Sequence, residues 1–561
     1  MIMPPDAQSD KIMLIGLKRP PVSLLIALVL AGLALLPMIA VLLALLSGRD
    51  PATDHVFATT LPRYIQNSLL LMIGVGAISL FIGVTAAWFV TVAAFPGRRV
   101  LSWLLVLPLA APAYIVAYLY TDLLEFSGPV QSGLRSLFNW QSGDYVFPPT
   151  RSLGGAMLML GLVLYPYVYI LARAAFRAQS RAQFQAARTL GLTATRAFFK
   201  VALPGARPAI IGGLALVMME TLADFGVADY FAIPTFSTGI FRTWLAMGET
   251  QSAMKLAGVM LLFVIALIMI EKVSQRGRVT SDHPLADDAP MFELNGAKAW
   301  GATAFCAVPV LLGFVVPVCV LLNLALTDGD TQPLRAIIGF ITNSLTLAGI
   351  TAGLATVIAL FFAYRERQIS REISVGLAAR LSRGSLRLAT LGYALPGALL
   401  AIGLLGPLGA FDQALTRWSR DVLGLSHGLL LTGTLALLIY ALIIRFLTVS
   451  FNSVSSGMEK LPLALDDAAR TLGARPLSVV QRLHIPLLSP SLAAGVALVF
   501  IDVMRELPAT LILRPFNFET LATRVYRLAS DERLAEASTS ALIIVLVGLL
   551  PVLFLSRLGR R

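Results

Sequence analysis

The sequence predicts an all-α polytopic membrane protein with about twelve transmembrane helices, arranged as two six-helix repeats of the same orientation. Of its 561 residues, 57% are hydrophobic and only 13% are charged, a composition that a soluble domain could not expose to water. Long apolar runs alternate with short basic loops throughout the chain. One polar stretch occurs twice, about half a chain apart, which indicates an internal duplication.

The net charge of +13 comes from arginines and lysines that lie mainly in short loops between the apolar runs. Such loops stay in the cytoplasm, so the charge predicts topology and does not indicate a nucleic-acid partner. The first apolar run, 22–47, is too long for a signal-peptide core, and we expect it to span the bilayer. Cys306 and Cys319 share one apolar segment and have no disulfide or metal spacing.

The first half is expected to consist of a cytoplasmic N-terminal segment, 1–21, and a membrane domain, 22–276. Pro108 and Pro112 lie inside its third span. They mark either a kink or break that could line a pathway or a simple packing irregularity. The six predicted spans of this domain are 22–47, 66–95, 100–123, 152–176, 208–231 and 253–271.

The second half repeats this plan. Residues 277–297 contain no long apolar run and are expected to form a cytoplasmic linker to a second membrane domain, 298–561. Asn343 opens the eighth span, within the same Asn-Ser-Leu sequence with which Asn67 opens the second. Twelve spans put both termini in the cytoplasm and relate the halves by a pseudo-two-fold axis along the membrane normal. The other spans of this half are 299–325, 388–410, 428–450, 488–512 and 537–556.

The stretch that occurs twice covers 185–204 and 467–486, and matched positions are about 282 residues apart. We expect each copy to fold as a helix, a turn at Gly, and a second short helix that is ended by Pro. An amphipathic basic helix on anionic lipid is the alternative, but it does not explain why the same residues recur at one offset. The matched positions are Gln185, Ala186, Ala187, Gly191 and Pro204 in the first copy and Asp467, Ala468, Ala469, Gly473 and Pro486 in the second.

These residues resemble the cytoplasmic coupling loop of binding-protein-dependent ABC importer permeases, which reads Glu-Ala-Ala, three residues, Gly, nine residues, Ile-x-Leu-Pro. Gln185 and Asp467 stand in place of the Glu, and Val201, Leu483 and Ile485 replace the aliphatic residues of the last motif. Two copies in one chain resemble a fused permease with a type I ABC importer-like architecture. The resemblance implies that each loop inserts into a cleft of an ATP-binding subunit, whose closure would drag the spans.

The same resemblance implies two ATP-binding partner subunits, a periplasmic substrate-binding protein and a location in the bacterial inner membrane. The chain contains no G-x-x-x-x-G-K-[ST] sequence, so we expect ATP and Mg on the partner subunits and no cofactor on this chain. It also contains no nucleophile elbow, H-E-x-x-H sequence or zinc-type cluster. We therefore expect a transport subunit and not an enzyme.

Two pairs of carboxylates follow the repeated stretches, Glu220 with Asp224 and Asp502 with Glu506. A spacing of four residues predicts that each pair shares one helical face, roughly 18–24 Å into the membrane if the helix starts near Pro208. Carboxylates at that depth are costly unless they face the bundle interior or water. The four could line a cation pathway and act as transient ligands for a hard metal ion.

The same carboxylates could instead be structural. Arg505 could pair with one of them, and Thr221 or backbone groups could satisfy others. They could also form a docking rim for the periplasmic binding protein. The residues alone do not choose among these readings.

A resemblance to the ferric iron permeases rests on Glu-Thr-Leu-Ala-Asp-Phe-Gly at 220–226, on Glu-Leu-Pro-Ala-Thr at 506–510, and on 513–518. It implies Fe³⁺ as the substrate, although fused permeases for thiamine and for phosphonates have the same plan. A rival of another class is an ion-coupled secondary transporter that uses the membrane carboxylates as a proton relay. A membrane-embedded enzyme is a further rival, for which the sequence shows no catalytic cluster.

Overall fold

The structure is a computed structural model that describes residues 22–48, 51–141, 143–179, 187, 189–275, 292–371, 377–424 and 428–558. Within these ranges, nine helices are long and apolar enough to cross a membrane, and two bent helix pairs raise that number to eleven. The last helix, α26 (Leu534–Leu558), adds a shorter apolar stretch. The predicted all-α membrane fold is therefore confirmed.

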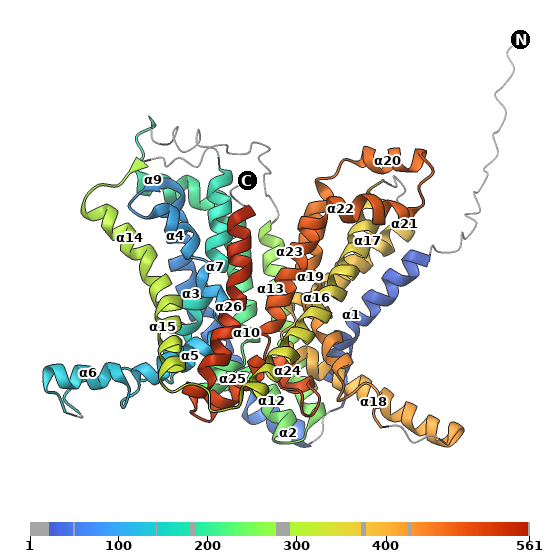
Figure 1. The fold of residues 1–561 in the computed structure, drawn as a ribbon, viewed down its shortest axis with the longest axis horizontal. Helices are drawn as coiled ribbons and strands as arrows, with labels where there is room; N and C mark the ends of the chain where they lie inside the picture. Colours follow the sequence, from blue (N-terminus) through green and yellow to red (C-terminus); the bar gives the residue numbers. More distant parts are fainter. Residues whose placement is uncertain are drawn as a thin grey trace, which may run out of the picture.

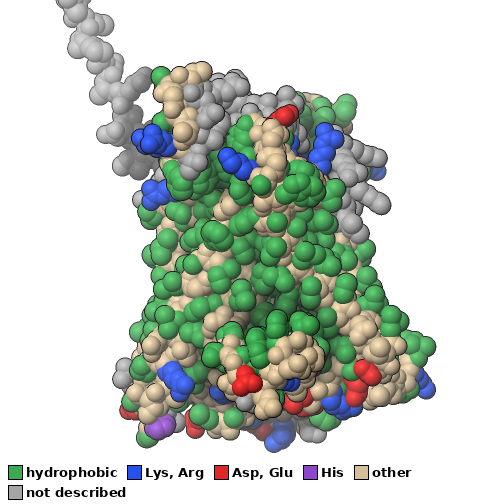
Figure 2. Space-filling view, turned by 90° about the vertical axis from the view of Figure 1, so that its left-hand side faces the viewer, with side chains coloured by type: hydrophobic (Ala, Val, Ile, Leu, Met, Phe, Trp, Pro, Cys, Tyr) green, Lys and Arg blue, Asp and Glu red, His purple; other side chains and the backbone are tan. Residues whose placement is uncertain are grey.

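Figure 2 shows a broad band of hydrophobic side chains around the middle of the molecule, with charged side chains gathered toward its two ends. Large apolar side chains such as Phe81 and Val357, each 66% exposed, lie on the spanning helices. Lipid chains accept these groups, whereas a charge in the same band would be costly.

The elements of the first half follow one another in the order α1 (Val22–Leu46), α2 (Pro51–Thr59), α3 (Leu61–Val92), β1 (Ala93–Ala94), α4 (Arg98–Leu104), η1 (Leu107–Ala110), α5 (Ala113–Leu124), α6 (Pro129–Phe138), α7 (Leu153–Ala178), α9 (Ala194–Ala197), η2 (Phe198–Ala202), α10 (Leu203–Ala223), α11 (Gly226–Tyr230), α12 (Phe236–Leu245) and α13 (Thr250–Gln275).

The second half follows the same plan, in the order β2 (Phe292–Glu293), α14 (Ala297–Val310), η3 (Leu311–Val315), α15 (Val316–Thr327), α16 (Leu334–Arg371), α17 (Leu377–Ala389), η4 (Thr390–Ala394), α18 (Gly397–Leu423), α19 (Leu435–Glu459), α20 (Leu463–Thr471), α21 (Pro476–Val479), η5 (Val480–His484), α22 (Ile485–Leu487), α23 (Ser489–Met504), α24 (Pro508–Leu513), α25 (Leu521–Ser530) and α26.

The first helix of each half packs against helices of the other half. In Figure 1, α1 lies beside the second-half helices, and it packs on α17 and α18. The first helix of the second half, α14 with α15, lies beside α3, α4 and α5 and packs on α4 and α5. The predicted domains 22–276 and 298–561 are therefore repeats along the chain but not separate bundles, because each bundle is completed by a helix of the other half.

Only the end of the predicted linker lies within the described residues. Phe292 and Glu293 form β2, which pairs in parallel with β1 at the end of α3. This part of 277–297 is thus held against the first half, and α14 already begins at Ala297. The predicted N-terminal segment, 1–21, and residues 276–291 lie outside the described residues.

The Asn-Ser sequence that opens the second and eighth spans makes the same clamp in both halves. The side-chain amides of Asn67 and Asn343 each donate to a backbone carbonyl just before α12 or α25, at 3.0 Å in both cases. The hydroxyls of Ser68 and Ser344 each accept from the first backbone N–H of the same helix, at 3.2 and 2.8 Å. These bonds satisfy donors that a helix N-terminus leaves unpaired, so the repeated sequence fixes α12 and α25 in place.

Two predicted spans are broken. The third, 100–123, bends by 91° between 98–110 and 113–138. The eleventh, 488–512, is interrupted between α23, which ends at Met504, and α24, which begins at Pro508, and a bend of 77° separates its start from the preceding helical stretch 476–487. Pro112 lies at the first bend, so a break is confirmed there over simple packing irregularity. The fifth predicted span also ends early, because α10 stops at Ala223 and α11 begins at Gly226.

The predicted outer loops contain short helices that the sequence analysis missed, among them α6, α12 and α25. Figure 1 shows these helices at the end of the molecule opposite to α9 and to α20, α21 and α22. The two repeated segments therefore lie together at one end, and the additional short helices cover the other.

Candidate coupling surface and central cavity

The second repeated segment, 467–486, turns at Gly473, whose φ of +80° lies in the left-handed region. Its N–H donates to the carbonyl of Arg470, and the N–H of Ala474 donates to the carbonyl of Ala469, at 2.9 and 3.0 Å. These are the bonds by which a glycine after a helix satisfies the last carbonyls. The predicted helix, turn and second helix are confirmed for this copy.

The first repeated segment, 185–204, makes the same turn. Gly191 has a φ of +84°, and the N–H of Leu192 donates to the carbonyl of Ala187 at 3.1 Å. Gln185 and Ala186 lie outside the described residues, so their predicted part in the partner contact stays a prediction. The two turns are nonetheless alike at every described position that makes them.

The expectation that Pro ends the second short helix is wrong for the first copy. There the helix runs without a break from Phe198 to Ala223, with Pro204 inside it. In both copies a wider turn precedes the proline, because the N–H groups of Leu203 and Ile485 reach back five residues to carbonyls 198 and 480. A proline lacks the donor of a regular turn, and this wider turn lets the helix continue.

The tips of the two turns expose apolar side chains at matched positions. Leu190 is 83% exposed and Leu472 is 87% exposed. Asp467 and Ala468 are also exposed, whereas Ala187 is 7% exposed and lies in an apolar cluster with Val92 of α3 and Ala197 of α9. Ala187 is thus buried within this chain, and the leucines at the turns are the most exposed large apolar side chains in the described parts of the two segments. The part of these residues in a partner contact stays a prediction.

A buried ionic triad anchors the second repeated segment to a spanning helix. Asp466 in α20 accepts from the Nε of Arg367 in α16 and from the Nε2 of His484 in η5, both at 2.8 Å. The Arg367 guanidinium also donates to three carbonyls at the end of α19 and the start of α20, at 2.9 to 3.0 Å. All three side chains of the triad are buried.

Burial alone would raise the pKa of Asp466, but the hydrogen bonds from Arg367 and His484 outweigh it and hold that pKa below its ordinary value. The carboxylate therefore stays ionised at neutral pH. A buried pair of this kind is a specific joint, because removing one partner leaves the other charge buried without compensation.

Aromatic rings hold the corresponding place in the first half. The ring centroid of Trp88 lies 5.5 Å from that of Phe176 and 4.8 Å from that of Phe198, so α3, α7 and η2 meet there. When the spans are aligned on Asn67 and Asn343, which are 276 residues apart, Arg367 matches Thr91; at the offset of 282, Asp466 and His484 match Phe184 and Ala202, and none of these three residues is charged. Among the residues that the structure describes, one repeated segment is thus anchored by ions and the other by aromatic packing.

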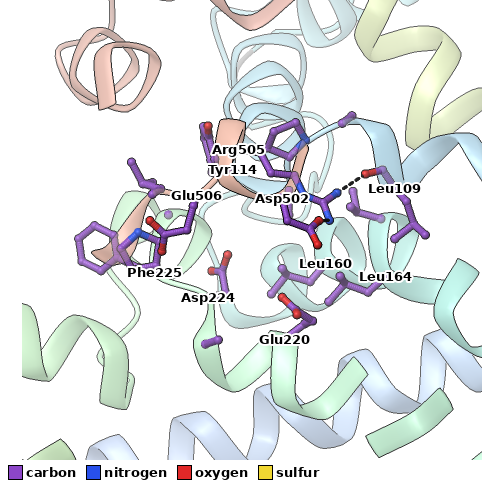
Figure 3. Close-up of a pocket in the computed structure, with 18 of the residues that line it drawn as sticks. Leu109, Tyr114, Leu160, Leu164, Glu220, Asp224, Phe225, Asp502, Arg505 and Glu506 are labelled. Carbon is purple, nitrogen blue, oxygen red and sulfur yellow. Dashed lines mark hydrogen bonds and ion pairs between the residues drawn. The ribbon is translucent and has the colours of Figure 1, made fainter. Parts of the chain in front are cut away.

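A cavity of about 140 Å³ lies between the two halves, where the broken spans meet (Figure 3). It brings together all four carboxylates that the sequence singled out. Two arginines and three tyrosines also line it, and the full set is Leu109, Ala111, Pro112, Ala113, Tyr114, Leu160, Val163, Leu164, Tyr167, Glu220, Ala223, Asp224, Phe225, Gly226, Tyr393, Arg445, Phe446, Asp502, Arg505, Glu506, Leu507 and Pro508.

Asp224 and Glu506 are helix caps. Asp224 accepts from two backbone N–H groups in α11 at 3.1 Å, and Glu506 accepts from the two matching groups in α24 at 3.0 Å. The prediction that each shares a continuous helical face with Glu220 or Asp502 is wrong, because the helix ends between the two carboxylates. The exposed N–H groups of the next short helix attract the carboxylate instead.

Asp502 pairs with Arg505, as the structural reading expected for one carboxylate. Arg505 also donates to the carbonyl of Leu109 in η1, at 2.6 Å, and so bridges the two halves (Figure 3). Glu220, by contrast, is half-buried and makes no hydrogen bond or ion pair with any described residue. It is the carboxylate of the cavity that no described residue bonds, although the charges of Arg445 and Arg505 act on it.

Arg445 in α19 is the main cavity residue that sequence reasoning missed. It is 8% exposed, and its Nη1 lies 3.9 Å from Glu506 but makes no hydrogen bond to any described residue. A Cβ on Gly397 would lie 2.6 Å from that Nη1, so the glycine leaves it room. An arginine inside a predicted span is a signal that could have found it.

In the described part of the chain, no three or more His, Cys, Asp or Glu side chains lie close enough together to hold a metal ion. In this conformation Glu220, Asp224, Asp502 and Glu506 therefore do not form a resident metal site. Their transient contact with a passing cation, and their place on a pathway, stay predictions.

Comparison with known proteins finds the family described as "Binding-protein-dependent transport system inner membrane component" twice, over 79–277 and 373–561. The Fe(3+)-transport system permease protein FbpB 2 of Haemophilus influenzae is 24% identical, and the match covers 96% of this chain and 99% of the relative. The ferric transport system permease protein FbpB of Actinobacillus pleuropneumoniae is 22% identical over 88% of this chain and 70% of its own length. The molybdenum transport system permease protein ModB of Escherichia coli K12 is 31% identical over 34% of this chain and 82% of its own.

Proposed function

The chain belongs to the family of binding-protein-dependent transport system inner membrane components, and from that premise we propose that it is the membrane-spanning subunit of an ATP-driven importer of ferric iron. The family assigns it to transport, across a bacterial inner membrane, with an ATPase and a binding protein as partners.

The observation that carries the proposal is the pair of matched turns at one end of the molecule. Leu190 and Leu472 are exposed in turns that contain a glycine in the left-handed region. After each turn the chain forms a short helix, which continues into a spanning helix in the first copy and bends onto one in the second. An exposed apolar knob of this kind fits a cleft on a partner protein. Two knobs accommodate two ATP-binding subunits, and ATP and Mg would be bound there and not on this chain.

This assignment makes the end that carries the repeated segments cytoplasmic, with both termini on that side. The opposite end, covered by α6, α12 and α25, would then face the periplasm and receive one substrate-binding protein. Closure of the ATPase pair would draw the two knobs together and move the halves about the central cavity. The pathway between the halves would open outward and inward in turn.

Ferric iron is proposed because two relatives that match the chain over 88% or more of its length carry iron in their names. A cavity of about 140 Å³ with four carboxylates suits a small ion. The molybdenum relatives, which match only a third of the chain, make an oxyanion the second candidate substrate.

An ion-coupled secondary transporter and a membrane-embedded enzyme are the rivals from other classes. Neither accounts for two exposed glycine turns at matched positions. In addition, two of the four carboxylates that a proton relay would use cap helices instead.

The test is ⁵⁵Fe uptake into proteoliposomes that contain this chain with its ATP-binding subunits and its iron-loaded binding protein. We expect uptake that needs ATP and both partners. Uptake driven by an ion gradient without ATP would contradict the importer class. ATP-driven uptake of molybdate but not of iron would keep the class and overturn the substrate.

A further inference from the structure

The two walls of the central cavity carry the same acids but different bases. Glu220 and Asp224 on the first-half wall match Asp502 and Glu506 on the second, at one offset. Both arginines that line the cavity come from the second half, and no basic residue from the described part of the first half lines it. At the positions that match Arg445 and Arg505, the first half has Val163 and Ala223, which also line the cavity.

The result is a cavity with two different electrostatic sides. On the second-half wall each carboxylate has a guanidinium beside it, Arg505 at Asp502 and Arg445 at Glu506. On the first-half wall no described guanidinium makes an ion pair with either carboxylate, although the charges of Arg445 and Arg505 both act on Glu220 across the cavity. Glu220, which no described residue bonds, is therefore the carboxylate left to contact a cation that enters the cavity.

Arg445 is not needed to hold the cap beside it. Asp224 accepts the same two backbone N–H bonds as Glu506 does, at nearly the same distances, without any guanidinium nearby in the matched position. The first half thus serves as an internal control for the second. The guanidinium of Arg445 is an addition to the cap, and it lines the cavity.

The Arg445 guanidinium retains hydrogen-bonding capacity. Its Nη1 is buried, lies 3.9 Å from the nearest carboxylate oxygen and makes no hydrogen bond to any residue that the structure describes. A buried donor without a partner is costly, and an oxyanion is the ligand that a guanidinium binds best. Arg505, in comparison, already bonds Asp502 and the carbonyl of Leu109.

We propose that the cavity receives a cation together with an oxyanion, with the cation at Glu220 and the oxyanion at Arg445. This inference rests on the proposed function, and for an iron importer it means that ferric iron crosses as an oxyanion complex and not as a bare ion. Two carboxylates and two guanidiniums on one wall and two carboxylates on the other leave the cavity acidic overall. A complex that keeps part of the metal's positive charge matches that balance.

The oxyanion could be inorganic or a hydroxycarboxylate, since both present oxygens to a guanidinium. The test distinguishes them in two arms of the proteoliposome assay, one with ⁵⁵Fe and [³²P]phosphate and one with ⁵⁵Fe and [¹⁴C]citrate. We expect ATP-dependent entry of the anion label together with ⁵⁵Fe in one arm. Entry of ⁵⁵Fe with neither label would overturn the inference but leave the iron importer standing. Absence of ATP-dependent ⁵⁵Fe entry in both arms would overturn both.

Variants of Arg445 and Glu220 test which residue binds the oxyanion and which binds the cation. Arg445→Val, which copies the first half, should lower anion entry about tenfold or more, and Arg445→Gln should do the same. Arg445→Lys keeps the charge and should restore part of it, which separates anion binding from misfolding. Glu220→Gln should lower ⁵⁵Fe entry. Anion entry that is equal in wild type and in both uncharged Arg445 variants would contradict the assignment, and exposed Leu158→Val on α7 is the matched control.

Discussion

The two repeated segments make the same turn but are attached to the spanning helices by different side-chain contacts. Gly191 and Gly473 have nearly the same backbone conformation and carry leucines that are 83% and 87% exposed. Yet the second segment is tied to its spanning helix by a buried Arg–Asp–His triad, and the first rests on aromatic rings packed at steep angles to one another. The contrast teaches that the outer surface of the segment is what both halves share. The means of fixing it to the membrane helices differs between them.

The largest effect should come from the shared feature. We predict that Gly191→Val together with Gly473→Val abolishes transport, because a β-branched residue in the left-handed region costs about 1–3 kcal/mol per site and reshapes both turns. Neither Cβ would meet another atom within 4 Å, so the loss comes from the backbone and not from a clash.

The measurement for this pair is ATP-driven ⁵⁵Fe uptake beside the amount of protein inserted in the membrane. Gly424→Val is the matched control, because Gly424 also has a positive φ and open space around it but lies at the end of α18. Normal uptake in the double variant would refute a coupling role for the turns. Equal loss in the control would point to general misfolding.

The next largest effect should distinguish the ionic attachment of the second segment from the aromatic attachment of the first. Arg367→Met leaves Asp466 buried without its main partner and should weaken the second segment's attachment by about 3–5 kcal/mol. We expect faster amide hydrogen exchange in 463–487, unchanged exchange in 189–203, and ATP hydrolysis that persists while uptake falls more than tenfold. Arg533→Met is the control. It breaks the ion pair between Arg533, which is half-exposed, and Glu536, and it should lower the stability by at most about 1 kcal/mol.

A smaller loss of stability is expected when the aromatic packing beneath the first segment is changed. Phe176→Leu keeps most of the buried volume, so it should cost about 1.5 kcal/mol or less and raise exchange only in 189–203. Uptake should fall a few-fold. If uptake fell as much as in the Arg367→Met variant, the aromatic packing and the ionic triad would be equally important for attaching the segments, contrary to our account.

The smallest effect on folding should come from the exposed knobs. Leu190→Ala and Leu472→Ala remove side chains that contact almost nothing within this chain, so stability should stay within about 0.5 kcal/mol. Affinity for the ATP-binding subunits should drop, and by similar amounts at the two sites. Pull-down of those subunits by each variant measures this, and unchanged binding by both would remove the knobs from the contact surface.

Much of the architecture could be predicted from the sequence. A helix that spans a membrane needs a long apolar run, and a duplicated chain repeats the residues that mark its span starts and turns. The Asn-Ser-Leu sequences at 67–69 and 343–345 and the glycines at 191 and 473 are local signals of that kind. The short outer helices were missed because they are held by tertiary bonds such as that from Ser68. Span ends near Asp224 were wrong because a spacing of four residues does not tell whether a helix continues or a new one is being capped.

The site was predicted in part for the same reason. All four carboxylates do meet at one cavity, but their partners come from distant parts of the chain. The triad joins residues 367, 466 and 484, and no local pattern announces such a contact. Arg445 stood alone in an apolar span, which is a readable sign, yet its neighbour Glu506 could be recognised only in three dimensions.

The central claim is that an external ATPase moves the two knobs relative to each other. The most direct test is the distance between spin labels at Leu190→Cys and Leu472→Cys, with Cys306 and Cys319 replaced by serine, in the complex with its ATP-binding subunits. We predict that ATP and Mg shift the distance distribution to shorter values and that the shift is lost without those subunits. A distribution that ATP leaves unchanged would contradict the account.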